Sequence, residues 1–187
     1  MPIRHLLAAS AAACLLFHNA GAVTLTADDQ WNSFDVDTFS ASSGGTEWID
    51  LGSGQPLHFT FSVGTGQFGR LTVVDGGFAG DSFKVLNGVA LLGKTSAPAD
   101  SYPGSVGTDF DAALADPAYS RRRFFLTAGN YDITGRLDRS ALVGGTALDA
   151  TVGALKLSVS PVPEPASAAL LLAGLVLLTA ALGRRRV

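Results

Sequence analysis

The strongest constraint on the fold is a strict two-residue alternation of apolar and polar side chains from Leu57 to Val63. Apolar residues occupy every second position, and His58, Thr60 and Ser62 lie between them. Because successive side chains of a strand point to opposite faces, this pattern predicts a β-strand with one buried face. A helix would instead bury residues three and four apart.

Similar alternation recurs along the chain, so the whole middle of the sequence is expected to be β. Further strands are predicted at residues 23–27, 46–51, 70–75, 124–127, 131–135 and 155–159. A hairpin over residues 82–92 turns at Asn87-Gly88, a strong turn signal. The best helical window, Asp109–Ala115, is one or two turns long. These elements predict an all-β fold, a jelly-roll-like β-sandwich. The first and last strands are candidates to pair, and the long connection 96–123 is a candidate functional loop.

The N-terminus has the pattern of a secretory signal peptide. A basic start precedes an apolar run at residues 6–17, and Ala20-Gly21-Ala22 ends it with small residues. The run is too short to cross a hydrocarbon core of about 30 Å at about 1.5 Å per residue. We therefore expect cleavage after Ala22, with Ala20 and Ala22 forming the cleavage site.

The C-terminus has the pattern of a single membrane span. Residues 166–183 carry no charge and would reach about 27 Å as a helix, enough for a thin bilayer. Arg184, Arg185 and Arg186 follow at once, which predicts a cytoplasmic C-terminus and an exported domain. A buried core helix is the alternative, but it would leave three adjacent arginines to be solvated.

These ends divide the chain into a signal peptide at 1–22, a β-sandwich domain at 23–160 and a C-terminal segment at 161–187. Residues 23–162 hold 9 basic and 15 acidic side chains, a net charge of −6, which disfavours nucleic acid as a partner. The one cysteine, Cys14, lies in the signal peptide, so no disulfide or thiol chemistry is expected in the domain.

The segment before the predicted span carries a recognisable motif. Val162-Pro163-Glu164-Pro165, the apolar stretch and the basic end together resemble the PEP-CTERM sorting signal. The domain, notably residues 71–83 and 125–135, also resembles the body of many exosortase-targeted proteins, for which the resemblance implies no activity.

The PEP-CTERM resemblance implies a partner and a destination. The partner is exosortase, a membrane-embedded, cysteine transpeptidase-like enzyme of Gram-negative bacteria. The precursor would be anchored in the inner membrane, then processed and delivered to the cell surface or extracellular matrix, in association with exopolysaccharide and biofilm. The two prolines disfavour helix before them, so Glu164 is expected in an extended segment that such an enzyme can bind.

Enzymatic activity is not expected. Residues 64–69 match G-x-G-x-x-G, but a strand rather than a helix follows, so the segment is interpreted as a hairpin turn. A catalytic triad would have to use His58, the only histidine of the domain, which lies in the middle of a strand. No spacing singles out a pair of carboxylates, and no cofactor is expected.

Two groups of side chains suggest a ligand. Asp75 and Asp81 flank a glycine-rich turn and Asp109 and Asp111 lie in the long connection, so these four are candidate calcium ligands. They are equally consistent with turn-forming aspartates that cap backbone amides. The run 121–123 is three arginines, which suit an acidic polysaccharide or phosphate, or protect a sheet edge from aggregation.

Two functions follow from these observations. The first is a non-enzymatic surface or matrix protein, sorted by exosortase and associated with exopolysaccharide. The alternative is a lectin-like, calcium-assisted carbohydrate-binding module.

Overall fold

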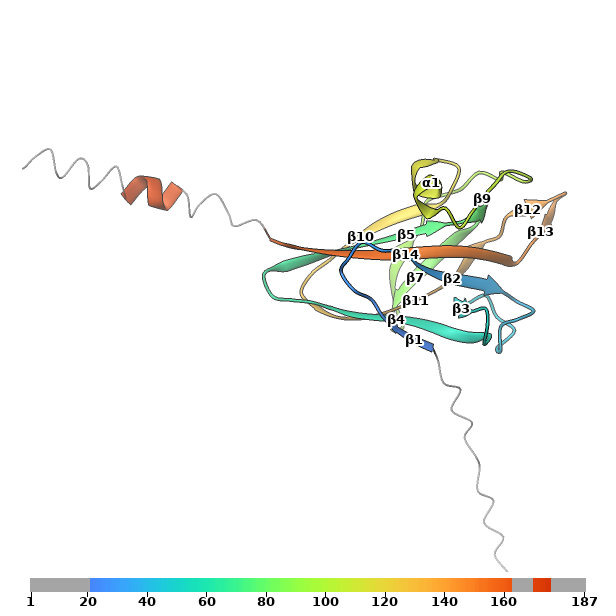
Figure 1. Cartoon of the computed structure of the whole chain (residues 1–187), viewed down its shortest axis with the longest axis horizontal. Coiled ribbons are helices and arrows are strands. Elements are labelled where there is room, and N and C mark those ends of the chain that lie inside the picture. The colour runs from blue at the N-terminus through green and yellow to red at the C-terminus, as the bar shows by residue number, and fades with distance from the viewer. Residues whose placement is uncertain (1–20, 163–169, 176–187) are drawn as a thin grey trace, which may run out of the picture.

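The computed structural model describes residues 21–162 and 170–175, and the first range forms an all-β domain, as predicted (Figure 1). One short helix, α1 (Phe110–Ala115), is inserted among the strands. The strands are β1 (Gly21–Thr24), β2 (Asn32–Asp37), β3 (Ile49–Asp50), β4 (Gln55–Val63), β5 (Gln67–Asp75), β6 (Gly77–Phe78), β7 (Ser82–Asn87), β8 (Ala90–Lys94), β9 (Ser105–Gly107), β10 (Arg121–Leu126), β11 (Gly129–Arg139), β12 (Leu142–Val143), β13 (Thr146–Ala147) and β14 (Ala150–Pro161).

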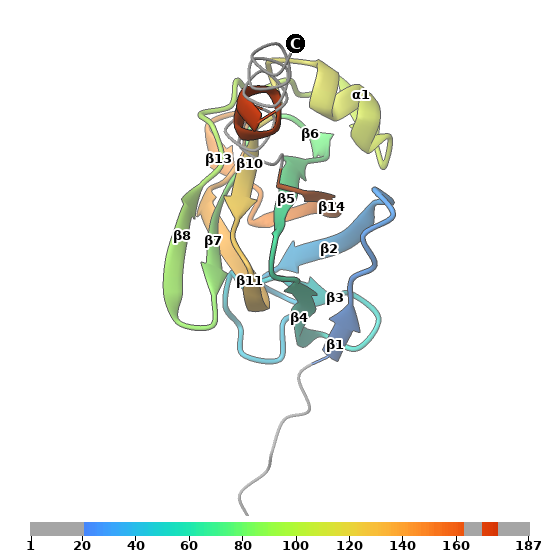
Figure 2. The ribbon, with the colours of Figure 1, turned by 90° about the vertical axis from the view of Figure 1, so that its left-hand side faces the viewer.

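The main sheet follows one path, β10-β5-β14-β2-β3-β4-β11-β7-β8, and β1 adds to β4 in parallel. Strands β5, β14 and β2 form one side of the domain and β11, β7 and β8 the other (Figure 2). The main sheet thus has two facing halves, which the two-residue strand β3 joins into a single sheet.

The core lies between these halves and is built from the alternating apolar residues. The four of β4 face inward, together with side chains of β2, β5, β7, β10, β11 and β14. At its centre, Phe34 of β2 stacks on Trp48, with ring centroids 3.8 Å apart and an interplanar angle of 16°. Phe83 of β7 meets both rings edge-on.

Two glycines make room for this stack. A Cβ atom at Gly135 of β11 would overlap the indole ring of Trp48, and one at Gly153 of β14 would overlap the ring of Phe34. Because the two glycines lie in opposite halves, the aromatic pair spans the interior from one wall to the other.

The ends of the sheet path come together, so the sheet is nearly closed. Ser96, just after β8, donates its amide to the Arg121 carbonyl of β10 over 3.0 Å. Arg121 returns a 3.0 Å hydrogen bond to the Ser96 hydroxyl, and the Thr95 and Ser120 hydroxyls lie 3.0 Å apart.

The long connection 96–123 is largely structured. It contains β9 and α1, which Asp109 caps by accepting a hydrogen bond from the Ala112 amide, so the predicted short helix is confirmed. Phe110 and Ala113 of α1 pack on Val74 and Ala154, covering one end of the outer face of β5 and β14.

Two expectations from the sequence are wrong, and one central strand was not expected. The first and last strands do not pair, since β1 joins β4 whereas β14 lies between β2 and β5. The G-x-G-x-x-G segment is not a hairpin, because β4 and β5 lie in opposite halves of the sheet. The central strand β2 was not predicted.

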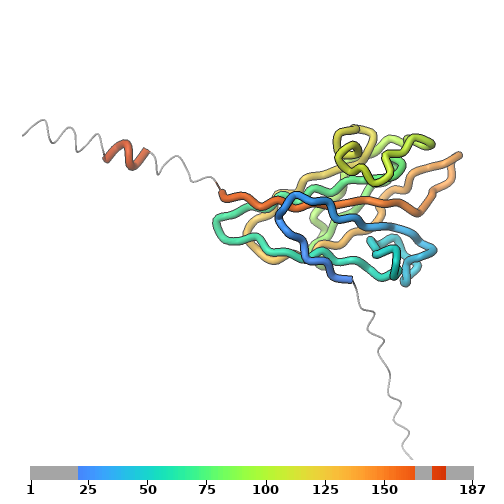
Figure 3. The backbone as a smooth tube through the Cα atoms, viewed as in Figure 1, coloured from blue at the N-terminus to red at the C-terminus, as the bar shows by residue number. Residues whose placement is uncertain are grey.

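The domain is closed off where the C-terminal segment begins. Strand β14 pairs with β5 as far as Pro161, opposite Gln67, and the Val162 amide donates to the Gly66 carbonyl over 2.8 Å. The chain leaves the domain at this end, beside the β4–β5 turn (Figure 3). Among the described residues, both apolar clusters draw only on residues 23–159. Residues 23–162 are called the exported domain below.

We expect Gly135→Ala to destabilise the exported domain by about 1–3 kcal/mol, because the added methyl group overpacks against Trp48. Gly52→Ala is the matched control, since its Cβ would meet only the exposed side chain of Asp50. Urea unfolding followed by tryptophan fluorescence measures both, and equal midpoints for the two variants would contradict the role of Gly135.

Candidate functional site

The three consecutive arginines of β10 do not share one face. In the antiparallel pairing with β5, Arg122 lies opposite the core residue Val73, whereas Arg123 lies opposite Thr72. Since directly paired residues project to the same side of a sheet, Arg122 is on the inner side and Arg121 and Arg123 are on the outer side.

Arg122 helps to close the sheet. Its guanidinium donates to the Lys94 carbonyl of β8 over 2.9 Å and lies over the ring of Phe124, 5.1 Å from its centroid. The Lys94 carbonyl thus has a donor and the Arg122 cation has an aromatic partner where the two sheet edges meet. This agrees with the edge-protecting alternative for Arg122.

Arg121, Arg123 and Arg70 form what we call the arginine strip, on the outer face of β10 and β5. Arg70 lies opposite Phe125, the next outward residue of β10 after Arg123, and Phe125 is 72% exposed. Arg123 and Arg70 are exposed, and Arg121 is half-buried where it donates to the Asp116 carbonyl. A hollow of about 300 Å³ lies between Leu114 of α1 and the three arginines of β10.

The arginine strip has no carboxylate partner within the described part of the chain. There, the lysines and Arg139 pair with Asp138, Asp29, Asp111 and Asp100, and none of these pairs includes an arginine of the strip. The guanidinium groups of Arg70 and Arg123 are therefore free to bind an anion in a domain whose net charge is negative, while Arg121 already donates one hydrogen bond to the Asp116 carbonyl.

The four candidate calcium ligands lie in two separate places. Asp75 and Asp81 lie together in the β5–β7 region and are fully buried. Asp109 caps α1, and Asp111 accepts a 3.0 Å hydrogen bond from the Trp31 indole and lies 3.6 Å from the Lys156 ammonium. Within residues 21–162 and 170–175, no three histidine, cysteine or acidic side chains gather as metal ligands.

Asp75 and Asp81 have strongly raised pKa values. Burial, followed by the charge of Asp81, raises the pKa of Asp75 to about 9, and burial raises that of Asp81 to about 6. One oxygen of Asp75 accepts from the Asp81 amide over 3.2 Å, and the other has no hydrogen-bond partner.

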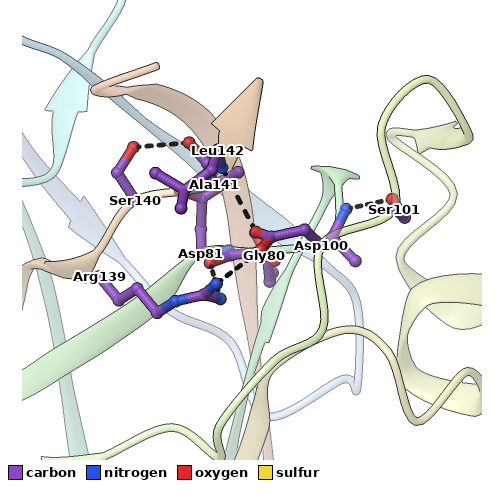
Figure 4. Close-up of polar contacts among 10 residues, drawn as sticks. Gly80, Asp81, Asp100, Ser101, Arg139, Ser140, Ala141 and Leu142 are labelled. Carbon is purple, nitrogen blue, oxygen red and sulfur yellow. Dashed lines mark hydrogen bonds and ion pairs between the residues drawn. The ribbon is translucent and has the colours of Figure 1, made fainter. Parts of the chain in front are cut away.

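Asp81 also joins this region to the end of β11. Its carboxylate accepts from the Ala141 amide over 2.9 Å. Arg139 donates to the Gly80 carbonyl and to Asp100, at 2.7 and 2.8 Å (Figure 4). The two aspartates thus hold backbone turns together, in agreement with the capping alternative for them.

His58 lies on the polar side of β4, as predicted, but the sequence does not indicate which side chain it contacts. Its Nδ1 lies 2.8 Å from the Asp132 carboxylate of β11, 74 residues away in sequence. No local pattern links the two positions; only the antiparallel pairing of β4 with β11 brings them together.

Most of the terminal predictions lie outside the described residues. These are Ala20 of the signal peptide, Pro163, Glu164 and Pro165 of the motif, and Arg184–Arg186. Ala22 is in β1, beside His58 of β4. Of the predicted span only 170–175 are described, as helix, and no described helix has the length and apolar character to cross a membrane.

Comparison with known proteins agrees with the motif in the sequence. Residues 161–186 match the family described as the PEP-CTERM protein-sorting motif. The chain is therefore a protein with a PEP-CTERM sorting motif, which confirms the resemblance. The motif implies export, a membrane-anchored precursor and exosortase as the processing partner.

No curated protein sequence matches the chain. Among solved structures, the pre-peptidase C-terminal domain of collagenase from Bacillus anthracis is similar, at 10% identity and a TM-score of 0.36, over 75% of this chain and 96% of that one.

We expect the stability of the exported domain to fall as pH rises from about 5 to 8, partly through Asp75. The pKa of Asp75 is raised in the folded state from an ordinary 3.8 to about 9. Between these values the folded state keeps a proton that the unfolded state releases, so stability declines with pH. Asp75→Asn cannot ionise, and its stability relative to wild type should increase by more than about 1.4 kcal/mol, the equivalent of one pKa unit, over this range.

Asp37→Asn is the control for this experiment. Hydrogen bonds from the Phe39 and Ser40 amides lower the pKa of Asp37, so its ionisation stabilises the folded state above pH 4 and changes little from pH 5 to 8. Urea unfolding at pH 5, 6.5 and 8 gives both profiles. Parallel profiles for wild type and Asp75→Asn would show that Asp75 is not protonated in the folded domain.

Proposed function

We propose that this chain is a non-enzymatic surface or matrix protein of a Gram-negative bacterium, whose exported domain binds an acidic exopolysaccharide on the arginine strip. The observation that carries the proposal is the outward position of Arg121, Arg123 and Arg70, of which Arg123 and Arg70 are exposed and make no ion pair among the described residues. A guanidinium binds a carboxylate through two parallel hydrogen bonds, a geometry that lysine does not offer.

The spacing of the strip suits a polymer. Residues two apart on a strand are separated by about 6.8 Å, so Arg121 and Arg123 present two guanidinium groups along β10, and Arg70 adds a third on β5. Phe125, beside Arg70, offers an exposed aromatic face to the C–H surface of a sugar ring.

Because the domain is acidic overall, we expect a polyanion to bind only at the arginine strip. With a net charge of −6, the domain as a whole repels a polyanion, so attraction depends on the few angstroms around the strip. Binding should therefore weaken steeply with salt and with the loss of individual arginines. A general basic surface would tolerate the loss of any one residue.

We expect the double variant Arg70→Gln/Arg123→Gln to bind a polyuronate such as alginate about tenfold more weakly than wild type, since two charge-assisted contacts are lost. Neither side chain makes a described hydrogen bond within the domain, so folding should be preserved. Affinity electrophoresis of the exported domain in alginate and in neutral dextran measures the difference.

The matched control is Lys84→Gln/Lys94→Gln, which removes the same charge from β7 and β8, where both lysines pair with Asp138. This control should bind alginate within about twofold of wild type. An equal loss in both double variants, or equal retardation of wild type by dextran, would contradict a site at the strip.

The sorting segment provides a separate test in the cell. In an exosortase-competent host we expect surface material to lack Arg184–Val187, because processing removes the predicted span. Glu164→Ala removes the only charge between Asp149 and Arg184 apart from Lys156, and leaves the apolar stretch intact, so we expect it to reduce the processed form severalfold.

Intact-mass spectrometry of surface and membrane fractions measures this processing. Asp50→Ala, which removes one exposed acidic side chain at the end of β3, is the control and should be processed normally. Mature protein that still carries Arg184–Val187, or an unchanged yield from Glu164→Ala, would count against processing directed by the motif.

A further inference from the structure

A second surface of the exported domain has the features of a ligand site. Strand β4 pairs with β11 only as far as Phe59, opposite Ile133. Beyond that point residues 46–48 take the place of β4, since the Trp48 amide donates to the Gly135 carbonyl and the Leu137 amide to the Thr46 carbonyl. Where the strands separate, a groove of about 790 Å³ opens on the outer face, within the usual range of ligand pockets.

One wall of this groove carries an oriented histidine. The Nδ1 atom of His58 lies 2.8 Å from the Asp132 carboxylate, which favours the proton on Nδ1 and leaves Nε2 as an acceptor in the neutral ring. Thr134, two residues after Asp132 on the same side of β11, adds a hydroxyl group.

The other wall carries charges of both signs. Glu47 accepts a hydrogen bond from the Ser43 hydroxyl and has no cation at ion-pair distance among the described residues. Arg136 is exposed and likewise has no carboxylate partner in the described part of the chain. Each therefore keeps hydrogen-bonding capacity for a ligand.

The end of the groove is apolar and open. It is formed by Leu86 and by Val89, which is 99% exposed at the tip of the β7–β8 hairpin. Gly45, Gly88 and Gly135 line the groove without side chains, so polar backbone lies close to its surface.

We propose that this groove binds a neutral saccharide unit, with Glu47 and Asp132 accepting hydrogen bonds from its hydroxyl groups and Arg136 donating to them. Acceptors and donors alternate within one groove, which suits hydroxyl groups because each both donates and accepts. Two carboxylates disfavour a polyanion, and Val89 and Leu86 match the apolar C–H face of a sugar ring.

This proposal rests on the proposed function in one respect only, namely that the ligand is a glycan. The groove lies on β4, β7 and β11, whereas the arginine strip lies on β5 and β10 in the facing half of the sheet. One domain would therefore hold two glycan segments on opposite faces and cross-link the matrix.

The test is a titration of the ¹⁵N-labelled exported domain with neutral gluco-, manno- and galacto-oligosaccharides, followed by amide chemical shifts. We expect at least one series to shift the amides of His58, Thr134 and Val89 and to leave those of the arginine strip unchanged. Glu47→Gln and Asp132→Asn should each weaken the affinity at least fivefold, and the spectra themselves report whether each variant is folded.

Arg70→Gln/Arg123→Gln is the control and should bind the same oligosaccharide with wild-type affinity. The proposal is overturned if no series shifts these amides at millimolar concentration, if the shifts lie elsewhere, or if an extended peptide or polyuronate fills the groove instead. If no oligosaccharide binds in the groove but alginate still binds, the proposed function stands. If an oligosaccharide binds in the groove but alginate does not bind, only the proposed function is overturned.

Discussion

The structure depends on the stack of Phe34 on Trp48, which spans the interior between Gly135 and Gly153. These four residues come from β2, the segment before β3, β11 and β14, so a single contact fixes the distance between the two halves of the sheet. Both proposed ligand surfaces lie on the outer sides of these halves. The arginine strip and the groove are held in place by strands whose inward side chains are buried in the core.

How far the sequence predicts this arrangement depends on whether the information is local. The alternation around Phe59 and the Asn87-Gly88 turn predict their strands correctly, because a period of two and a turn residue act within a few positions. The sequence does not indicate β2, although Phe34 and Val36 alternate with polar residues, because three of its six residues are asparagine or aspartate, which are rare in strands. Which strands become neighbours is decided by contacts across the whole domain, so the pairing of β1 with β4 could not be foreseen.

The candidate sites follow the same rule. The three arginines are visible as a run, but alternation divides them between a closing contact at Arg122 and two outward side chains, and Arg70 joins them from about fifty positions away. The groove depends on two strand pairings. One brings His58 next to Asp132, and the other places Glu47 opposite Arg136. The glycine-rich turn in the sequence points to Asp75 and Asp81 as candidates. Their complete burial, however, results from the packing of the β5–β7 region and is not visible in the sequence.

The hydrogen bond from Val162 to Gly66 means that the folded domain ends where the sorting motif begins. Only three residues separate Val162 from the first residue of the predicted span, Ala166. Four steps of extended chain reach at most about 14 Å, so the β4–β5 turn of an anchored precursor would stay within that distance of the span. Arg70 is only three residues from Gln67, which pairs with Pro161 at this same end. A bulky polymer held at Arg70 would crowd the space in which the membrane enzyme works, which favours a sequence of events in which the chain is released first and meets its glycan afterwards.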